Sequence, residues 1–97
     1  MTNITNHASN RLKERSGLNK KSQQRIVDKA FELGMSHNET KGNLNKWISK
    51  LFLSHKKAGC IKLYGDKAYL FTNKESKTLI TIIQIPNNLK KYVKGET

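Results

Sequence analysis

The sequence has one cysteine, one proline and no long apolar run, and each shortage excludes a class of structure. Cys60 stands alone, so no disulfide can form within the chain and no cluster of thiolate ligands can hold a metal. No stretch approaches the roughly twenty apolar residues that a membrane-spanning helix needs. The first six residues have neither the basic start nor the apolar run of a secretory signal. These absences predict a cytoplasmic protein with no membrane partner.

Acidic residues are also scarce. Seven Asp and Glu stand against 19 Lys and Arg, which gives a formal net charge of +12 over 97 residues. Self-repulsion of this size is most easily tolerated when the partner is a polyanion. Because the positive residues are spread along the chain, the charge favours nucleic acid over a lipid surface or an acidic protein patch. The alternative is a cationic surface that only keeps the protein in solution.

The stretch from Ile61 to Ile85 predicts a three-stranded antiparallel meander. Apolar and polar residues alternate on both sides of a Gly65-Asp66 turn, which is typical of a tight hairpin. A third run, rich in β-branched residues, continues until Pro86 removes a backbone donor. Simple alternation in this run places one apolar set on each face, namely Leu79, Ile83 and Ile85 on one and Ile80 and Ile82 on the other. We therefore expect both faces of the sheet to be covered.

Helical periodicity predicts three helices before the sheet and a short one after it. The first runs from His7 to about Arg15, with Thr5 or Asn6 as its cap and Gly17 at its end. The second runs from Lys20 to Leu33, with Asn19 as its cap and Gly34 closing it in the left-handed conformation. The third begins near Asn43, and its inward-facing residues are Leu44, Trp47, Ile48, Leu51 and Phe52. The last is built on Leu89, Tyr92 and Val93.

The predicted fold class is therefore α+β, with N-terminal helices packed on a small antiparallel β-meander and a short C-terminal helix. With 35% hydrophobic residues, the chain is expected to form a single domain over residues 1–97 around one modest core.

His7, Arg11 and Arg15 fall along one edge of the first predicted helix, beside the stripe formed by Ala8 and Leu12. A histidine can exchange a proton near neutral pH, and arginines can hold a phosphate and the charge that develops on it. The three residues are therefore candidate catalytic residues of a metal-independent ribonuclease. The alternative is that His7 is an ordinary polar residue at the helix start and that the arginines contact the sheet edge or water.

The opening His7-Ala8-x-x-Arg11-Leu12-x-Glu14-Arg15, followed by an amphipathic helix and later a β-meander, resembles small bacterial and phage proteins of the RelE and BrnT-like group. These belong to a wider ribonuclease fold shared with barnase and with certain colicin and contact-dependent toxins. The resemblance covers the order of elements over most of the chain and, specifically, His7 to Arg15.

The resemblance implies metal-independent cleavage of RNA, with basic residues of the helix edge and sheet binding the phosphate. On this sequence it nominates His7, Arg11 and Arg15. It also makes Tyr92, with Lys90 and Lys91, a counterpart of a basic and aromatic C-terminal segment.

Cationic and aromatic residues alternate on the predicted strands and form a second candidate site. Aromatic rings can stack on unpaired bases while lysines contact the phosphate backbone. The candidate nucleic-acid-binding residues are Lys56, Lys57, Lys62, Tyr64, Lys67, Tyr69, Lys90, Lys91 and Tyr92. The alternative is that Tyr69 and Phe71 belong to the core and that the lysines only keep an edge strand in solution.

No cofactor and no metal are expected. His37 with Glu39, and His55 with Cys60, lack the spacing of metal ligands.

Two functions remain open on the sequence alone. The first is a nucleic-acid-binding protein, with RNA favoured over DNA, whose basic surface combines the first helix, the loop at Lys56 and Lys57, and the sheet. In its catalytic form it is a toxin-like endoribonuclease of a toxin–antitoxin system, with a protein antitoxin as a further partner. The second is a non-catalytic protein of a phage or mobile element that blocks a host machine which handles nucleic acids.

Overall fold

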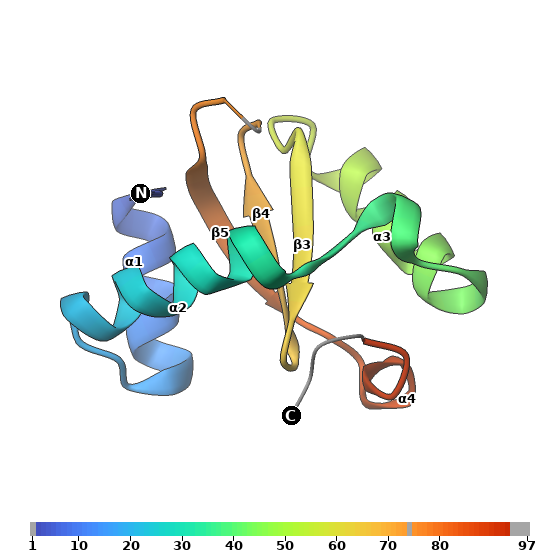
Figure 1. Ribbon diagram of the computed structural model, residues 1–97, viewed down its shortest axis with the longest axis horizontal. Helices are drawn as coiled ribbons and strands as arrows, with labels where there is room; N and C mark the ends of the chain where they lie inside the picture. The colour runs from blue at the N-terminus through green and yellow to red at the C-terminus, as the bar shows by residue number, and fades with distance from the viewer. Residues whose placement is uncertain (1, 74, 94–97) are drawn as a thin grey trace.

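Helices cover both faces of a five-stranded sheet (Figure 1). The computed structural model describes residues 2–73 and 75–93. Its elements, in chain order, are β1 (Asn3–Ile4), α1 (Asn6–Ser16), α2 (Lys20–Leu33), β2 (Met35–Ser36), the 3-10 helix η1 (His37–Glu39), α3 (Gly42–Ser54), β3 (Cys60–Tyr64), β4 (Lys67–Phe71), β5 (Thr78–Gln84) and α4 (Asn87–Lys90). The predicted α+β class is confirmed. No helix in the described part of the chain has both the length and the apolar composition needed to cross a bilayer.

The strand order in the sheet is β1-β5-β4-β3-β2. The three central strands form the predicted antiparallel meander, and the turn between β3 and β4 contains Gly65 at a positive φ of 62°. Two edge strands were not predicted. β1 pairs in parallel with the start of β5, and β2 pairs antiparallel with β3. Each is two residues long, which is too short for an alternating pattern to be visible in the sequence.

A β-bulge interrupts β5 near its start. Leu79 and Thr81 pair with neighbouring residues of β4, so Ile80 is an extra residue between them. Past a bulge, the alternation of side chains between the two faces shifts by one position. The predicted division of this strand into two faces is therefore wrong, because Leu79 shares its face with Ile82 and not with Ile83.

The sheet divides the hydrophobic core into two layers, whereas a single core was expected. The layer under α1 and α2 contains Ala8, Leu12, Val27, Ala30, Cys60, Tyr69, Phe71, Leu79 and Ile82. The layer under α3 and α4 contains Leu44, Ile48, Leu51, Ala58, Ile61, Leu63, Ala68, Leu70, Ile85, Leu89 and Val93. β5 is apolar on both sides and both faces of the sheet are covered, as predicted, because each face packs against a pair of helices.

Polar caps fix the start of both N-terminal helices. The Thr5 side chain accepts a hydrogen bond from the Ala8 N–H, and its hydroxyl donates to the Ile80 carbonyl at 3.2 Å. Asn19 accepts from the Ser22 N–H and caps α2, as predicted. Because Thr5 bonds to both α1 and β5, it fixes the position of α1 along the sheet as well as the start of the helix.

Gly34 ends α2 by close packing and not by the predicted left-handed conformation. Its φ is −65°, a value that any residue can adopt. A Cβ at this position would lie 2.3 Å from the Ala30 carbonyl oxygen and 2.9 Å from the Lys62 Cβ. Glycine is therefore required here because α2 passes directly against β3.

Gly34→Ala is expected to lower the free energy of unfolding by about 1–3 kcal/mol, because the added methyl group overpacks the junction of α2 and β3. Chemical denaturation measures this loss. The matched control is Leu33→Ala. Since the Leu33 side chain is 64% exposed, that change should shift stability by no more than about 0.5 kcal/mol. Equal effects of the two substitutions would contradict the close approach at Gly34.

Candidate nucleic-acid interface

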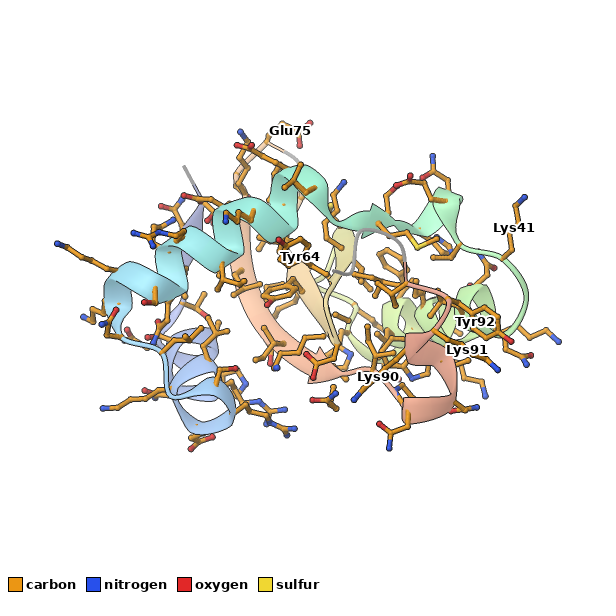
Figure 2. The ribbon with its side chains drawn as sticks, turned by 60° about the horizontal axis from the view of Figure 1, so that its bottom comes forward. Lys41, Tyr64, Glu75, Lys90, Lys91 and Tyr92 are labelled. Atoms are coloured by element: carbon orange, nitrogen blue, oxygen red, sulfur yellow. The ribbon has the colours of Figure 1, made fainter. Side chains whose placement is uncertain are left out.

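Several of the predicted residues meet at the end of the sheet that carries the β3–β4 turn. Tyr64 pairs with Lys67, and Lys67 pairs with Gln84, so these three side chains lie on one face across three strands. Together with Asp66 they form what we call the turn-end surface. Figure 2 shows Tyr64 with α1 and α2 to one side and α4 to the other.

Arg11 reaches the sheet from α1 at the open edge of β5. Its neighbours on the helix, Ala8 and Leu12, are fully buried and turn the Arg11 side chain toward the strand. The guanidinium Nη2 donates one long hydrogen bond, 3.4 Å, to the carbonyl of Ile82. Its Nε is buried and has no hydrogen-bond partner among the described residues.

The charge of Arg11 has no counter-ion in the described part of the chain. The ion pairs found there, at 4.0 Å or less, join Asp66 to Lys67 and Asp66 to Lys90. A partly buried cation is costly unless it is paired or well hydrogen-bonded. Arg11 therefore retains most of its capacity to bind an anion.

His7 and Arg15 are exposed on α1, each about one helical turn from Arg11. The predicted common edge is present on the helix, but only Arg11 is turned against the sheet. His7 lies near the start of α1, beside the cap that joins the helix to Ile80. The catalytic roles of the three residues remain a prediction.

Asp66 provides the counter-charge of the turn-end surface. Its carboxylate lies 3.0 Å from the Lys67 Nζ and 4.0 Å from the Lys90 Nζ, and the Gln84 side-chain amide donates to it at 3.3 Å. Partial burial by itself would raise the pKa of Asp66, but the hydrogen bonds from Lys67 and Gln84 outweigh this effect and lower it below its ordinary value. Lys67 and Lys90 are therefore partly neutralised within the protein, and an incoming phosphate competes with Asp66 for them.

The two candidate tyrosines of the sheet differ in accessibility. Tyr69 is 4% exposed and packs in the core, so its ring is not available to stack on a base. Burial, with the nearby Asp66 and Tyr64, raises the pKa of Tyr69 to about 12, which keeps its phenol protonated at neutral pH. Tyr64 is only partly buried, so it is the ring of this pair that a base could contact.

Lys62 lies on the same face but points toward the end of α2. Its Nζ is 5.8 Å from the centre of the Phe31 ring, and the Nζ of Lys77 is 5.3 Å from the same centre. Phe31 packs edge-on against Phe71 at 5.0 Å. Lys62 therefore interacts with an aromatic ring of its own chain.

Lys56 and Lys57 are exposed at the opposite end of β3 from the turn-end surface. The loop that carries them enters β3 through Gly59, whose N–H donates to the Phe71 carbonyl, and Ala58 packs in the layer under α3 and α4. The four residue steps from Cys60 to Tyr64 span about 13 Å. The prediction that this loop, the first helix and the sheet form one basic surface is wrong, because α3 approaches the sheet from the face opposite to α1.

The residues predicted around α4 separate into buried and exposed groups. Leu89 and Val93 are buried, whereas Tyr92 is 51% exposed and its ring lies 5.3 Å from the Nζ of Lys91. Figure 2 shows Lys90, Lys91 and Tyr92 side by side on this part of the molecule. Lys90 reaches Asp66, so α4 contributes to the edge of the turn-end surface.

The sequence did not predict that Gln84, Asp66 and Lys77 lie beside the candidate binding residues. Gln84 lies opposite Lys67 only because of the bulge in β5, and no local pattern announces that pairing. Asp66 was interpreted as a turn residue alone. Lys77 adopts a positive φ of 52°, which is uncommon for a residue other than glycine.

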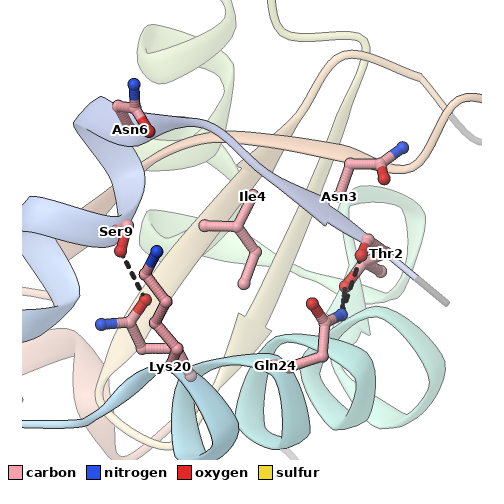
Figure 3. A pocket seen from close by; sticks show the side chains of 8 residues that line it. Thr2, Asn3, Ile4, Asn6, Ser9, Lys20 and Gln24 are labelled. Carbon is pink, nitrogen blue, oxygen red and sulfur yellow. Dashed lines mark hydrogen bonds between the residues drawn. The ribbon is translucent and has the colours of Figure 1, made fainter.

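A separate hollow of about 270 Å³ lies between β1, α1 and α2 (Figure 3). Its hydroxyl and amide groups are largely bonded to one another. Ser9 donates to Gln23 at 2.7 Å, and Gln24 donates to the Thr2 carbonyl at 2.8 Å. Asp28 accepts from both the N–H and the hydroxyl of Thr2. These bonds hold β1 against α2.

Over residues 2–73 and 75–93, no three His, Cys, Asp or Glu side chains are grouped as metal ligands would be.

Comparison of the chain with protein-family models, with curated proteins and with solved structures gave no match. The resemblance to RelE and BrnT-like proteins therefore stays a prediction.

The Thr2–Asp28 contact predicts a pH-dependent stability. Partial burial would raise the pKa of Asp28, but its hydrogen bonds with Thr2 and Gln24 lower it below the ordinary value of 3.8. A group with a lowered pKa stabilises the fold above its unfolded pKa, and this contribution is lost as the pH falls through the folded pKa. We expect Asp28→Asn to destabilise the protein at pH 7, with a difference from wild type that shrinks below about pH 4. Urea denaturation at several pH values measures this difference, and a constant difference would contradict the prediction.

Proposed function

We propose that this protein binds RNA through Arg11 and the turn-end surface. The single observation that carries the proposal is the partly buried Arg11 guanidinium, which has one long hydrogen bond and no carboxylate partner among the described residues. Such a group favours a phosphate, which can accept its forked hydrogen bonds.

The surroundings of Arg11 support a polyanionic ligand. The chain carries a net charge of +12, and Lys67, Lys90 and Lys91 lie at the same end of the sheet. Tyr64 adds a partly exposed ring that can stack on an unpaired base. RNA in an unpaired conformation presents both phosphates and accessible bases, which favours it over duplex DNA. RNA as the partner also agrees with a cytoplasmic location.

Arg11→Ala is expected to weaken RNA binding by about tenfold or more, because a hydrogen bond to a charged group contributes roughly 1.5–3 kcal/mol. It should also reduce the slope of log affinity against log salt concentration by about one. Fluorescence anisotropy with a labelled RNA at several salt concentrations measures both quantities.

The matched control for this experiment is Arg25→Ala, which removes the same charge from an exposed position of α2. Arg11→Lys keeps the charge but loses the fork, so its affinity should fall between those of wild type and Arg11→Ala. If Arg11→Ala and Arg25→Ala weaken binding equally, the net charge alone accounts for the affinity and the proposed site is wrong.

A second candidate function is metal-independent cleavage of the bound RNA. The observation that favours it is the placement of His7 and Arg15 on the exposed edge of α1, about one turn to either side of Arg11. An imidazole at this position can exchange a proton with an RNA hydroxyl, and Arg15 can bind a second phosphate.

We expect the purified protein to cleave RNA in the presence of EDTA, and His7→Ala with Arg11→Ala to abolish cleavage. His55→Ala, which removes a partly buried imidazole beyond the end of α3, should leave the cleavage rate unchanged. Gel electrophoresis of a labelled RNA follows the reaction, and circular dichroism confirms that each variant is folded. Undiminished cleavage by the double variant would rule out these roles. If the wild-type protein binds RNA without cleaving it, the protein is non-catalytic, and it acts by binding RNA or by blocking a host machine.

A further inference from the structure

A hollow of about 250 Å³ opens where β2 separates from β3. The two strands pair only at Met35 with Leu63 and at Ser36 with Lys62, and the chain then turns away into η1. The hollow is lined by Ser36, His37, Asn38, Phe52, Gly59, Cys60 and Ile61. It therefore lies between η1, α3 and the start of β3, away from Arg11.

Two aromatic rings line this hollow. The imidazole of His37 and the ring of Phe52 lie 5.2 Å apart with an angle of 50° between their planes. The His37 Nε2 is 3.3 Å from the Ser49 hydroxyl, and the His37 carbonyl accepts a hydrogen bond from Thr40 at 2.6 Å. Both η1 and the imidazole are thus bonded to other parts of the chain, so the rings provide a preformed surface for stacking.

A polar group lies beside the rings. The Ser36 hydroxyl lies 2.7 Å from the side-chain oxygen of Asn38 and 3.0 Å from a carboxylate oxygen of Glu39, and these two acceptors share its one hydrogen. The Asn38 amide nitrogen has no hydrogen-bond partner in the described part of the chain, so it can donate to a ligand.

Lys56 and Lys57 lie in the loop that precedes Gly59, one of the residues that line the hollow. Both are exposed, and neither has a carboxylate within ion-pair distance among residues 2–73 and 75–93. Gly59, two residues further on, lines the hollow and is held by the bond from its N–H to the Phe71 carbonyl. A Cβ on Gly59 would lie 2.3 Å from the Thr72 carbonyl oxygen, so the loop is fixed closely against β4.

We infer that this hollow is a nucleotide-binding subsite, with the base against Phe52 and the phosphate at Lys56 and Lys57. An aromatic surface, an amide donor and two ammonium groups match a planar heterocycle that carries a phosphate. The choice of a nucleotide as the ligand rests on the proposed RNA binding, whereas the site itself is separate from Arg11. It also gives a role to the two lysines that the fold places away from the turn-end surface.

The test is isothermal titration of the full chain with adenosine and guanosine monophosphates, with ribose 5-phosphate and inorganic phosphate as probes that lack a base. Stacking contributes roughly 1–3 kcal/mol per base, so at least one nucleotide should bind about fivefold or more tightly than ribose 5-phosphate. Phe52→Leu should remove this preference, and Lys56→Ala with Lys57→Ala should weaken binding of all phosphorylated probes. Leu53→Ala, at a position of the same helix that is 75% exposed, should change neither.

Because Phe52 packs against the core, the fold of its variant must be checked by denaturation. Asn38→Ala, at an exposed position, provides an independent variant, which should weaken nucleotide binding but not ribose 5-phosphate binding. Any of three results would rule out the subsite. The first is equal affinity for nucleotides and inorganic phosphate, and the second is the absence of saturable nucleotide binding. The third is wild-type nucleotide affinity in both the Phe52 and Asn38 variants.

Arg11→Ala separates the two proposals. It should weaken RNA binding while leaving mononucleotide binding at the hollow unchanged. RNA binding that depends on Arg11, without any binding of mononucleotides, would remove the subsite and leave the proposed function standing. Nucleotide binding that depends on Phe52, together with RNA binding that Arg11→Ala leaves unchanged, would support the subsite and rule out the proposed RNA site at Arg11.

Discussion

The burial of β5 on both faces is the constraint on which the arrangement of this protein depends. A strand with apolar side chains on two sides is stable only when both sides are covered. The chain meets this requirement with α1 and α2 on one face and α3 and α4 on the other. Basic residues carried by these helices are therefore distributed between two faces of the molecule, and no single surface collects them all.

Because Arg11 is partly buried, its charged group is less hydrated than those of the exposed lysines. An exposed ammonium group keeps its hydration and gains little from any one partner. Arg11 has lost part of its hydration against β5 and has received a single long hydrogen bond in return. Lys67 is also largely buried, but Asp66 compensates its charge. An incoming phosphate would therefore gain more from Arg11 than from either type of lysine.

Local features of the fold could be predicted from the sequence because local residues determine them. The hairpin at Gly65-Asp66, the caps at Thr5 and Asn19, and the end of α1 at Gly17 each depend on a few neighbouring residues. The conformation of Gly34 could not be predicted in the same way, because it results from contact with a strand almost thirty positions later in the chain. The two-residue edge strands likewise exist only through their pairing with distant strands.

In the candidate site, too, some features depend on neighbouring residues and others on contacts with distant strands. The shared edge of His7, Arg11 and Arg15 follows from helical geometry, so the sequence was sufficient to predict it. Which of the three contacts the sheet depends on how Ala8 and Leu12 pack against distant strands. The separation of Lys56 and Lys57 from Arg11 depends on the face to which α3 docks, and an amphipathic helix does not encode that choice in its own pattern.

The extra residue in β5 separates two halves of one strand, and the alternation of side chains between the faces shifts by one position from one half to the other. Ahead of Ile80, Leu79 pairs with both Ile4 of β1 and Phe71 of β4, and beyond Ile80 the strand pairs with β4 alone. A chain shortened by one residue at this point could keep only one half in place. Either Leu79 would leave the layer beneath α1, or Gln84 would give up its position beside Lys67. The bulge thus allows one strand to anchor the N-terminal segment and to present a polar side chain at its far end.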